Sequence, residues 1–220
     1  MGMLSLYLLR HGETEFSRQD RFCGRIDAPL TPGGREMAAR FAAAYGTLDW
    51  RAILTSTRTR AIESATPLAL RTGLVVEADH RLDEMFYGEW QGLSKQEIAA
   101  RDADYFARWE RDPSIGPPRG ESPHEVSARA RAVLQDLLAR HAEGRVLIVS
   151  HKALLRILLC DLFGIDLRHY RRGAWPVGGV TQIDLGVGAP ALRRFADVEH
   201  LTSADESDQR TPPPLTVASA

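Results

Sequence analysis

Two histidines in this chain closely follow apolar runs that are each about one β-strand long. Arg10 and His11 come after the run at residues 4–9, and His151 comes after the run at residues 146–149. Such runs are typical of strands buried on both faces of a sheet, and ligands bind at the carboxyl ends of parallel strands. An imidazole can attack phosphorus, and an adjacent guanidinium can hold phosphoryl oxygens. The residues therefore predict phosphoryl transfer through a phosphohistidine, with His151 beside His11.

Two further groups follow other predicted strands. An arginine in the first turn of the helix after residues 52–55 can point back to the carboxyl edge of the sheet, and we favour Arg60 over Arg58 as this second phosphate clamp. The alternative is a solvated charge on the helix. Glu84 lies among apolar neighbours that would favour the protonated acid, so it could donate a proton, although Asp83 competes for this role.

The composition limits the alternatives. The 220 residues are 44% hydrophobic with a formal net charge of −1, which predicts one domain over residues 1–202. Residues 203–220 are rich in Ser, Asp, Pro and Thr, a composition typical of a mobile tail. The chain has no basic face for a nucleic-acid backbone, so we expect no nucleic-acid partner.

Neither a signal segment nor a membrane-spanning stretch is evident, so we expect a cytoplasmic protein without a membrane partner.

Cys23 and Cys160 are the only cysteines, too few for a disulfide framework or a zinc site, and we expect each to be a small buried or half-buried hydrophobe. No heptad repeat or apolar stripe indicates an oligomeric interface, so the sequence leaves the oligomeric state open.

Strand-length apolar runs alternate with helix signals along the chain. Thr31-Pro32 is typical of a helix start, Gly46 and Gly73 of helix ends, and Ser94 and Ser122 begin capping-box patterns. The alternation predicts an α/β fold, a three-layer α/β/α sandwich with a mostly parallel central sheet. The expected strands cover residues 4–9, 52–55, 74–76, 146–149, 180–185 and 192–196, and the expected helices cover residues 32–45, a segment from Thr57 or Arg58 to 72, segments after Ser94 and Ser122, and residues 153–163.

Five motifs in this order resemble the histidine phosphatase (phosphoglycerate mutase-like) superfamily. The resemblance extends from about Leu4 to about Leu201, and five ordered elements match by chance far less often than any one of them. The motifs are Arg10-His11-Gly12-Glu13-Thr14, residues 56–61, Leu82-x-Glu84 with Tyr87-Gly88 and Gly92, Gly120-Glu121-Ser122, and Ser150-His151.

The resemblance implies a role for each matching residue. His11 would be the nucleophile, and Arg10 and Arg60 would bind the phosphoryl oxygens. His151 would donate a hydrogen bond to one of these oxygens. Glu84 would protonate the leaving alkoxide and then take a proton from the water that cleaves the phosphohistidine. These groups could stabilise the transition state without a metal or another cofactor, so we expect none.

Further positions are expected to contact or support the substrate. Gly24 is one, and Ser17 is another, although the family commonly has asparagine there and the shorter serine would contact phosphate differently or not at all. Lys152 replaces the glycine that often follows the second histidine and could add a cation near the mouth of the site. Glu121 could support the N-terminus of the following helix.

The family contains both mutases and phosphatases. Met85 and Phe86 follow Glu84 where the mutases have a basic pair, and the stretch between Gly92 and Gly120 leaves little room for a lid. We therefore predict a phosphomonoesterase that acts on small phosphorylated metabolites. One alternative is a cofactor-dependent phosphoglycerate mutase, and Lys95 does match a substrate contact of the mutases. The other is a non-catalytic phosphate-binding module.

The sequence does not distinguish one phosphomonoester from another. Phe22, Met85, Phe86 and Tyr87 could form an apolar wall of the site, although aromatic residues at such spacings are more often core. A second anion on the substrate could be bound by Arg21, Lys95 or Arg119.

Overall fold

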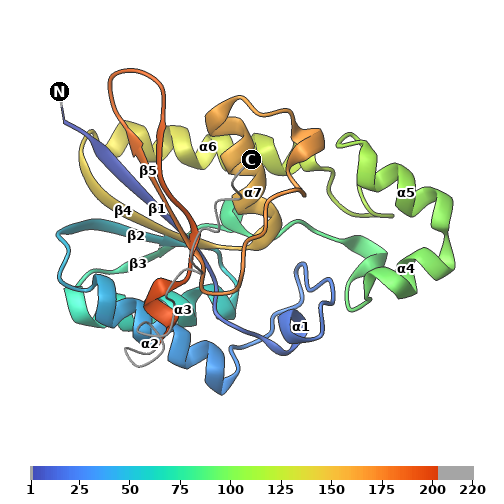
Figure 1. Cartoon of the computed structure of the whole chain (residues 1–220), viewed down its shortest axis with the longest axis horizontal. Helices are drawn as coiled ribbons and strands as arrows, with labels where there is room; N and C mark the ends of the chain where they lie inside the picture. Colours follow the sequence, from blue (N-terminus) through green and yellow to red (C-terminus); the bar gives the residue numbers. More distant parts are fainter. Residues whose placement is uncertain (1, 203–220) are drawn as a thin grey trace, which may run out of the picture.

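A six-stranded β-sheet forms the centre of this computed structural model, which describes residues 2–202 (Figure 1). The strand order is β3-β2-β4-β1-β5-β6, with β1 to β4 parallel to one another and β5 and β6 antiparallel to their neighbours. The strands are β1 (Leu4–Arg10), β2 (Trp50–Thr55), β3 (Val76–Ala78), β4 (Gly144–Ser150), β5 (Val180–Leu185) and β6 (Ala191–Asp197). The predicted tail at residues 203–220 lies outside the described residues.

Two pairs of helices cover the two faces of the sheet (Figure 1). One pair is α2 (Pro32–Tyr45) and α3 (Thr59–Thr72), and the other is α6 (Pro123–Arg140) and α7 (Lys152–Phe163). The predicted α/β/α sandwich with a mostly parallel sheet is therefore confirmed. Within residues 2–202, no helix combines the length and the hydrophobicity needed to cross a membrane.

The central strand β1 contributes side chains to both hydrophobic cores. Leu4, Leu6 and Leu8 pack with side chains of α6 and α7, whereas Tyr7 and Leu9 pack with those of α2 and α3. Successive side chains of a strand point to opposite faces of the sheet. A strand that is covered on both faces must therefore be apolar throughout, as the sequence run indicated.

The helix ends agree with the signals in the sequence. The Thr31 side chain accepts a hydrogen bond from the Gly34 N–H at the start of α2, and Gly73 ends α3 with φ = 72°. Ser94 and Ser122 each form a complete capping box. These side chains satisfy backbone N–H groups that have no partner within the helix.

Two details differ from the prediction. The stretch after Ser94 holds two helices, α4 (Lys95–Arg101) and α5 (Ala103–Arg111), which extend to one side of the sheet (Figure 1). Asp102 separates them and caps α5, with its side chain accepting from the Tyr105 N–H at 2.9 Å. The strand expected at residues 74–76 is found two residues later as β3, because its pairing with β2 begins at Val76.

Short helices complete the connections around the carboxyl edge of the sheet. They are α1 (Glu15–Arg18), η1 (His80–Leu82), η2 (Gly88–Trp90), η3 (Leu167–His169) and η4 (Glu199–Leu201). Arg10 at the end of β1 is in register with Ser150 at the end of β4, so the residues that follow these two strands emerge side by side. The register of β1 and β4 therefore places His11 and His151 at the same edge of the sheet.

Candidate active site

His11 and His151 lie next to each other beyond the carboxyl ends of β1 and β4. Their ring centroids are 5.1 Å apart, and the residues are 6% and 0% exposed. Because β1 and β4 are adjacent parallel strands, the two histidines meet although 140 residues separate them in the sequence. The structure thus brings together the two rings that the sequence analysis placed at one edge.

The backbone after β1 orients the His11 ring. Nδ1 of His11 lies 2.7 Å from the Gly12 carbonyl oxygen, and since a carbonyl can only accept, Nδ1 carries the proton. Nε2 therefore keeps its lone pair. His11 lines a cavity beyond the carboxyl ends of the strands, and Arg10, Arg60 and Glu84 also form its wall. The loop approaches α2 so closely that a Cβ on Gly12 would lie 2.5 Å from the Gly34 carbonyl oxygen.

Arg60 reaches the site from the first turn of α3, as predicted. It is 1% exposed, and its guanidinium donates to three acceptors: Nε to Nδ1 of His151 at 3.2 Å, Nη1 to the Ile26 carbonyl at 2.9 Å and Nη2 to the Gly24 carbonyl at 2.8 Å. These contacts hold the guanidinium in one orientation. Gly24 does not line the cavity, so its contact is with Arg60.

Arg10 is held by the segment that precedes β5. Its Nη1 donates to the Trp175 carbonyl oxygen at 2.5 Å, while its buried Nε has no hydrogen-bond partner among the described residues. Burial lowers the pKa of Arg10 to about 10, so the side chain is still a cation at neutral pH. Arg10 and Arg60 both line the cavity beside His11, where two guanidinium groups can bind phosphoryl oxygens.

His151 is connected to Asp83 through a serine hydroxyl. Nε2 of His151 lies 2.7 Å from Oγ of Ser56, and this hydroxyl lies 2.8 Å from Oδ1 of Asp83. An ionised carboxylate only accepts, so the Ser56 hydroxyl donates to Asp83 and accepts from Nε2–H of His151. His151 does not line the cavity, its Nδ1 accepts from Arg60 and its one N–H is given to Ser56, so donation to a phosphoryl oxygen requires Nε2–H to leave Ser56 or Nδ1 to gain a proton.

Asp83 is fully occupied by this network and by Arg58. Its oxygens also accept from the Thr57 N–H at 2.9 Å and from Nε and Nη2 of Arg58 at 3.0 and 2.5 Å. Burial raises the pKa of Asp83, but the hydrogen bonds from Arg58, Thr57 and Ser56 outweigh burial and lower it overall. Arg58 and Asp83 form an ion pair away from the cavity lining, which leaves Arg60 and Glu84 as the groups that face the site.

Glu84 lines the cavity and is 8% exposed. Oε1 accepts a hydrogen bond from the Met85 N–H at 2.8 Å, and Oε2 accepts one from the Ala153 N–H at 3.3 Å. Ala153 is in the first turn of α7, so the N-terminal end of that helix orients the carboxyl group. The group is thereby held at the wall of the same cavity as His11.

Both histidines are kept neutral by their surroundings. Burial, followed by the charges of Arg60 and Arg10, lowers the pKa of His11 well below its ordinary value of 6.5. Burial and the charge of Arg60 do the same to the pKa of His151. A neutral imidazole is the form that can attack phosphorus, so His11 is prepared to act as a nucleophile at neutral pH.

Ser17 and Lys152 both line the cavity. Oγ of Ser17 also donates to the Thr14 carbonyl at 2.9 Å and completes a capping box for α1, so the hydroxyl has a structural partner. Lys152 is the first residue of α7, and its Nζ lies 3.9 Å from Oδ1 of Asp20.

The other candidates divide between the cavity and the rest of the molecule. Phe22 and Tyr87 line the cavity, and so do Arg21 and Lys95. The remaining three lie elsewhere: Met85 is buried in the core, Phe86 lies under the Arg25 guanidinium, and Arg119 is exposed and paired with Glu89.

Glu121 supports the loop that carries Glu84. Its carboxylate accepts from the Phe86 N–H at 2.8 Å and from Nε and Nη2 of Arg129 at 3.1 Å, whereas the helix N-terminus is capped by Ser122. Glu121 therefore supports the loop after Glu84 and not, as expected, the N-terminus of the helix.

Cys23 is half-buried and Cys160 is buried, as predicted. Within the described part of the chain, no group of three or more His, Cys, Asp or Glu side chains is arranged to hold a metal ion.

Several residues of the cavity wall were not identified from the sequence. Arg156 follows Lys152 by four residues on α7, a spacing that places both on one face of the helix and could have suggested it. Trp109 comes from α5, and Tyr170 and Arg171 follow η3. No local pattern marks these three, because tertiary packing alone brings their elements to the site. The cavity is also lined by Thr14, Asp20, Cys23 and Ala153.

Comparison with known proteins agrees with this arrangement. The family model described as histidine phosphatase superfamily (branch 1) matches residues 6–198. The chain belongs to the histidine phosphatase superfamily. Glucosyl-3-phosphoglycerate phosphatase from Mycobacterium tuberculosis (strain ATCC 25618 / H37Rv) is 33% identical over 182 residues, which cover 79% of each protein. Phosphoserine phosphatase 1 from Hydrogenobacter thermophilus is 29% identical over 169 residues, or 76% of this chain and 80% of the relative.

Solved structures of histidine phosphatase relatives share the fold. YhfR from Bacillus stearothermophilus superimposes with a TM-score of 0.84 at 32% identity, covering 90% of this chain and 100% of that one. The native structure of mycobacterial glucosyl-3-phosphoglycerate phosphatase gives a TM-score of 0.82 at 30% identity, covering 88% and 99% of the two chains. The resemblance stated from the motifs is therefore confirmed over almost the whole described chain.

Proposed function

We propose that this chain is a metal-independent phosphomonoesterase that cleaves small phosphorylated metabolites through a phosphohistidine at His11. The observation that carries the proposal is the orientation of His11: its Nδ1–H donates to the Gly12 carbonyl at 2.7 Å, which leaves a neutral Nε2 at a cavity that Arg10, Arg60 and Glu84 also line. These groups supply a nucleophile, two anion-binding groups and an acid in one place.

In the first step, Nε2 of His11 attacks phosphorus and the bond to the ester oxygen breaks. Arg10 and Arg60 bind the equatorial oxygens, where charge develops in the transition state. Glu84 protonates the departing alkoxide, so the alcohol leaves neutral. The ring of His11 then carries the phosphoryl group on Nε2 and remains hydrogen-bonded to Gly12 through Nδ1–H.

In the second step, water attacks the phosphohistidine. Glu84 is now a carboxylate and takes a proton from this water, and Nε2 of His11 leaves with its lone pair restored. Inorganic phosphate departs, and the enzyme returns to its starting protonation state. His151 supports both steps by fixing Arg60 through Nδ1.

The choice of a phosphatase over a mutase is supported by the names of the relatives, which are phosphatases for glucosyl-3-phosphoglycerate and for phosphoserine. We further propose that residues 1–202 act as a single catalytic domain and that the protein is cytoplasmic.

Release of phosphate in the presence of a chelator tests this function. The panel contains p-nitrophenyl phosphate, 3-phosphoglycerate and phosphoserine, and the control is His11→Ala. We expect release by the wild-type protein and at least a thousandfold loss in the variant at an unchanged melting temperature. Absence of release by the folded wild-type protein would contradict the proposal, and isomerisation of 3-phosphoglycerate stimulated by 2,3-bisphosphoglycerate would then separate a mutase from a binding module.

A further inference from the structure

The cavity wall holds more positive charge than one phosphoryl group requires. Five arginines and two lysines line it, against two carboxylates, Asp20 and Glu84. Arg10 and Arg60 are assigned to the phosphoryl group, and Arg21 is paired with Glu97 at 2.9 Å. Of the four remaining cations, Lys95 lies on α4, and Lys152 is 3.9 Å from Asp20. Lys152 and Arg156 on α7 and Arg171 after η3 form what we call the α7–η3 cation cluster.

The members of the α7–η3 cation cluster are close enough to repel one another. Burial lowers the pKa of Lys152, and the charges of Arg10 and Arg156 lower it further. Burial also lowers the pKa of Arg156, and the charge of Arg171 acts in the same direction. Like charges gathered in a partly buried wall are unfavourable by themselves, so their grouping indicates an anionic ligand.

Hydrogen-bond donors of the cluster are buried without protein acceptors. Among the described residues, Nε of Arg156 and both Nε and Nη2 of Arg171 have no hydrogen-bond partner. Buried polar groups in proteins almost always have partners, so each exception needs an explanation. Nε and Nη2 of Arg171 are two donors on neighbouring nitrogens, the fork that binds a carboxylate or phosphate through two parallel hydrogen bonds.

The Arg171 guanidinium is held in place by aromatic rings. Its Cζ lies 3.9 Å from the ring centroid of Trp109 and 4.3 Å from that of Tyr170, and its Nη1 donates to the Glu110 carbonyl at 3.2 Å. Stacking restricts the plane of the guanidinium without occupying its remaining donors. The donors are thus oriented before any ligand arrives, which reduces the entropy lost on binding.

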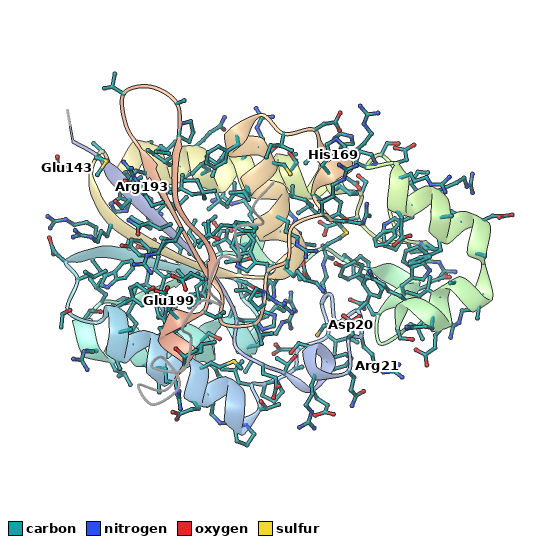
Figure 2. The ribbon with its side chains drawn as sticks, in the orientation of Figure 1. Asp20, Arg21, Glu143, His169, Arg193 and Glu199 are labelled. Carbon is teal, nitrogen blue, oxygen red and sulfur yellow. The ribbon has the colours of Figure 1, made fainter. Side chains whose placement is uncertain are left out.

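The wall of the cavity is assembled from both sides of the sheet edge. Figure 2 labels Asp20 and Arg21 after α1 and, higher in the same half of the picture, His169 in η3, two residues before Arg171. We infer that the α7–η3 cation cluster is a second anion subsite, which binds a carboxylate or phosphate on the alcohol part of the substrate. The inference rests on the proposed function and narrows it: the preferred substrates are phosphomonoesters whose leaving alcohol is itself an anion.

Matched pairs of esters test the subsite. 3-Phosphoglycerate and glycerol 1-phosphate differ by a carboxylate, and 1,3-propanediol bisphosphate and its monophosphate differ by a second phosphate. We expect the wild-type kcat/KM to be at least tenfold higher for the member that carries the second anionic group, in one pair or in both, and the pair that responds identifies the anion.

Arg156→Met and Arg171→Met should each lower this preference roughly tenfold, because one charged hydrogen-bonding partner is lost. Arg168→Met is the matched control: Arg168 lies three residues from Arg171, is paired with Asp166 and has a 65% exposed side chain. It should leave the preference unchanged. The preference is a ratio measured on one protein sample, so partial misfolding of a variant does not affect it.

The two proposals fail in different ways. Hydrolysis of p-nitrophenyl phosphate with no preference in either pair, or with a preference that survives both substitutions, overturns the subsite and leaves the phosphatase intact. If no ester is hydrolysed, the proposed function fails, and calorimetry on His11→Ala still decides the subsite. The subsite is supported if His11→Ala binds 3-phosphoglycerate at least tenfold more tightly than glycerol 1-phosphate and if this difference disappears in His11→Ala/Arg171→Met. Equal affinities of His11→Ala for the two esters would refute the subsite.

Discussion

Arg60 donates from Nε to Nδ1 of His151 at 3.2 Å, so the second phosphate clamp and the second histidine form one unit. Arginine has no acceptor, and Nδ1 therefore contributes its lone pair. The other ring nitrogen, Nε2, lies 2.7 Å from Oγ of Ser56. The tautomer of His151 is thereby determined by two neighbours, and the orientation of Arg60 depends on that tautomer.

Arg60→Lys should remove this unit while keeping a positive charge. A lysine has one nitrogen and cannot contact His151, Ile26 and Gly24 together, as Arg60 does. We expect kcat/KM for p-nitrophenyl phosphate to fall about a hundredfold or more, which steady-state kinetics would measure. Arg40→Lys, at a half-buried arginine of α2 that does not line the cavity, is the control. Near-wild-type activity in Arg60→Lys would mean that charge alone suffices.

Ser56→Ala should disconnect His151 from Asp83. Nε2–H of His151 would lose its acceptor in a site where His151 is 0% exposed. Loss of a partner for a buried polar group costs about 1–3 kcal/mol, so we expect the free energy of unfolding to fall by that amount. Urea denaturation measures it. Nitrogen NMR of the imidazole gives a second readout: Arg60 still donates to Nδ1, so the proton stays on Nε2, but the Nε2–H resonance should shift because its acceptor is lost. An unchanged His151 spectrum would contradict the proposed hydrogen bond to Ser56.

Glu84→Gln should affect substrates according to their leaving group. Glutamine fits the space of Glu84 but cannot protonate an alkoxide, so esters of poor leaving groups need the acid most. We expect kcat/KM to fall about 10²- to 10⁴-fold for alkyl phosphates and much less for p-nitrophenyl phosphate. A series of aryl and alkyl phosphates would show a steeper dependence on leaving-group pKa in the variant. Equal losses for all esters would remove Glu84 from the acid role.

Stability should fall on the acid side of about pH 6.5. The pKa values of buried His11 and His151 lie well below 6.5 in the folded chain, so only the unfolded chain takes up protons on these rings as the pH drops through that value. The unfolded state then binds more protons, and the free energy of unfolding decreases by up to about 1.4 kcal/mol per pH unit per histidine.

Urea denaturation between pH 5 and pH 7.5 measures this dependence. His11→Asn removes one of the rings, so its slope below pH 6.5 should be smaller by up to one proton than that of the wild type. His200 is partly buried with a lowered pKa and contributes equally to both proteins, so the difference isolates His11. Identical slopes would show that His11 titrates normally in the folded protein.

The sequence by itself determined the fold class and the residues at the ends of the strands. Strands covered on both faces need continuous apolar runs, and helix ends need capping side chains, so β1, β4 and the capping boxes at Ser94 and Ser122 could be read locally. Arg10, His11 and His151 follow such runs directly. Adjacent parallel strands then leave only one edge at which they can meet.

Only the tertiary structure decided which groups share the cavity and what each one contacts. The choice of Glu84 over Asp83 depends on Arg58 and Ser56, which occupy Asp83 from another element of the fold. The position of Arg171 depends on stacking against Trp109 of α5, far away in the chain. Local patterns report propensity and burial, whereas contacts between distant segments arise from packing of the whole chain, and no short stretch of sequence contains that information.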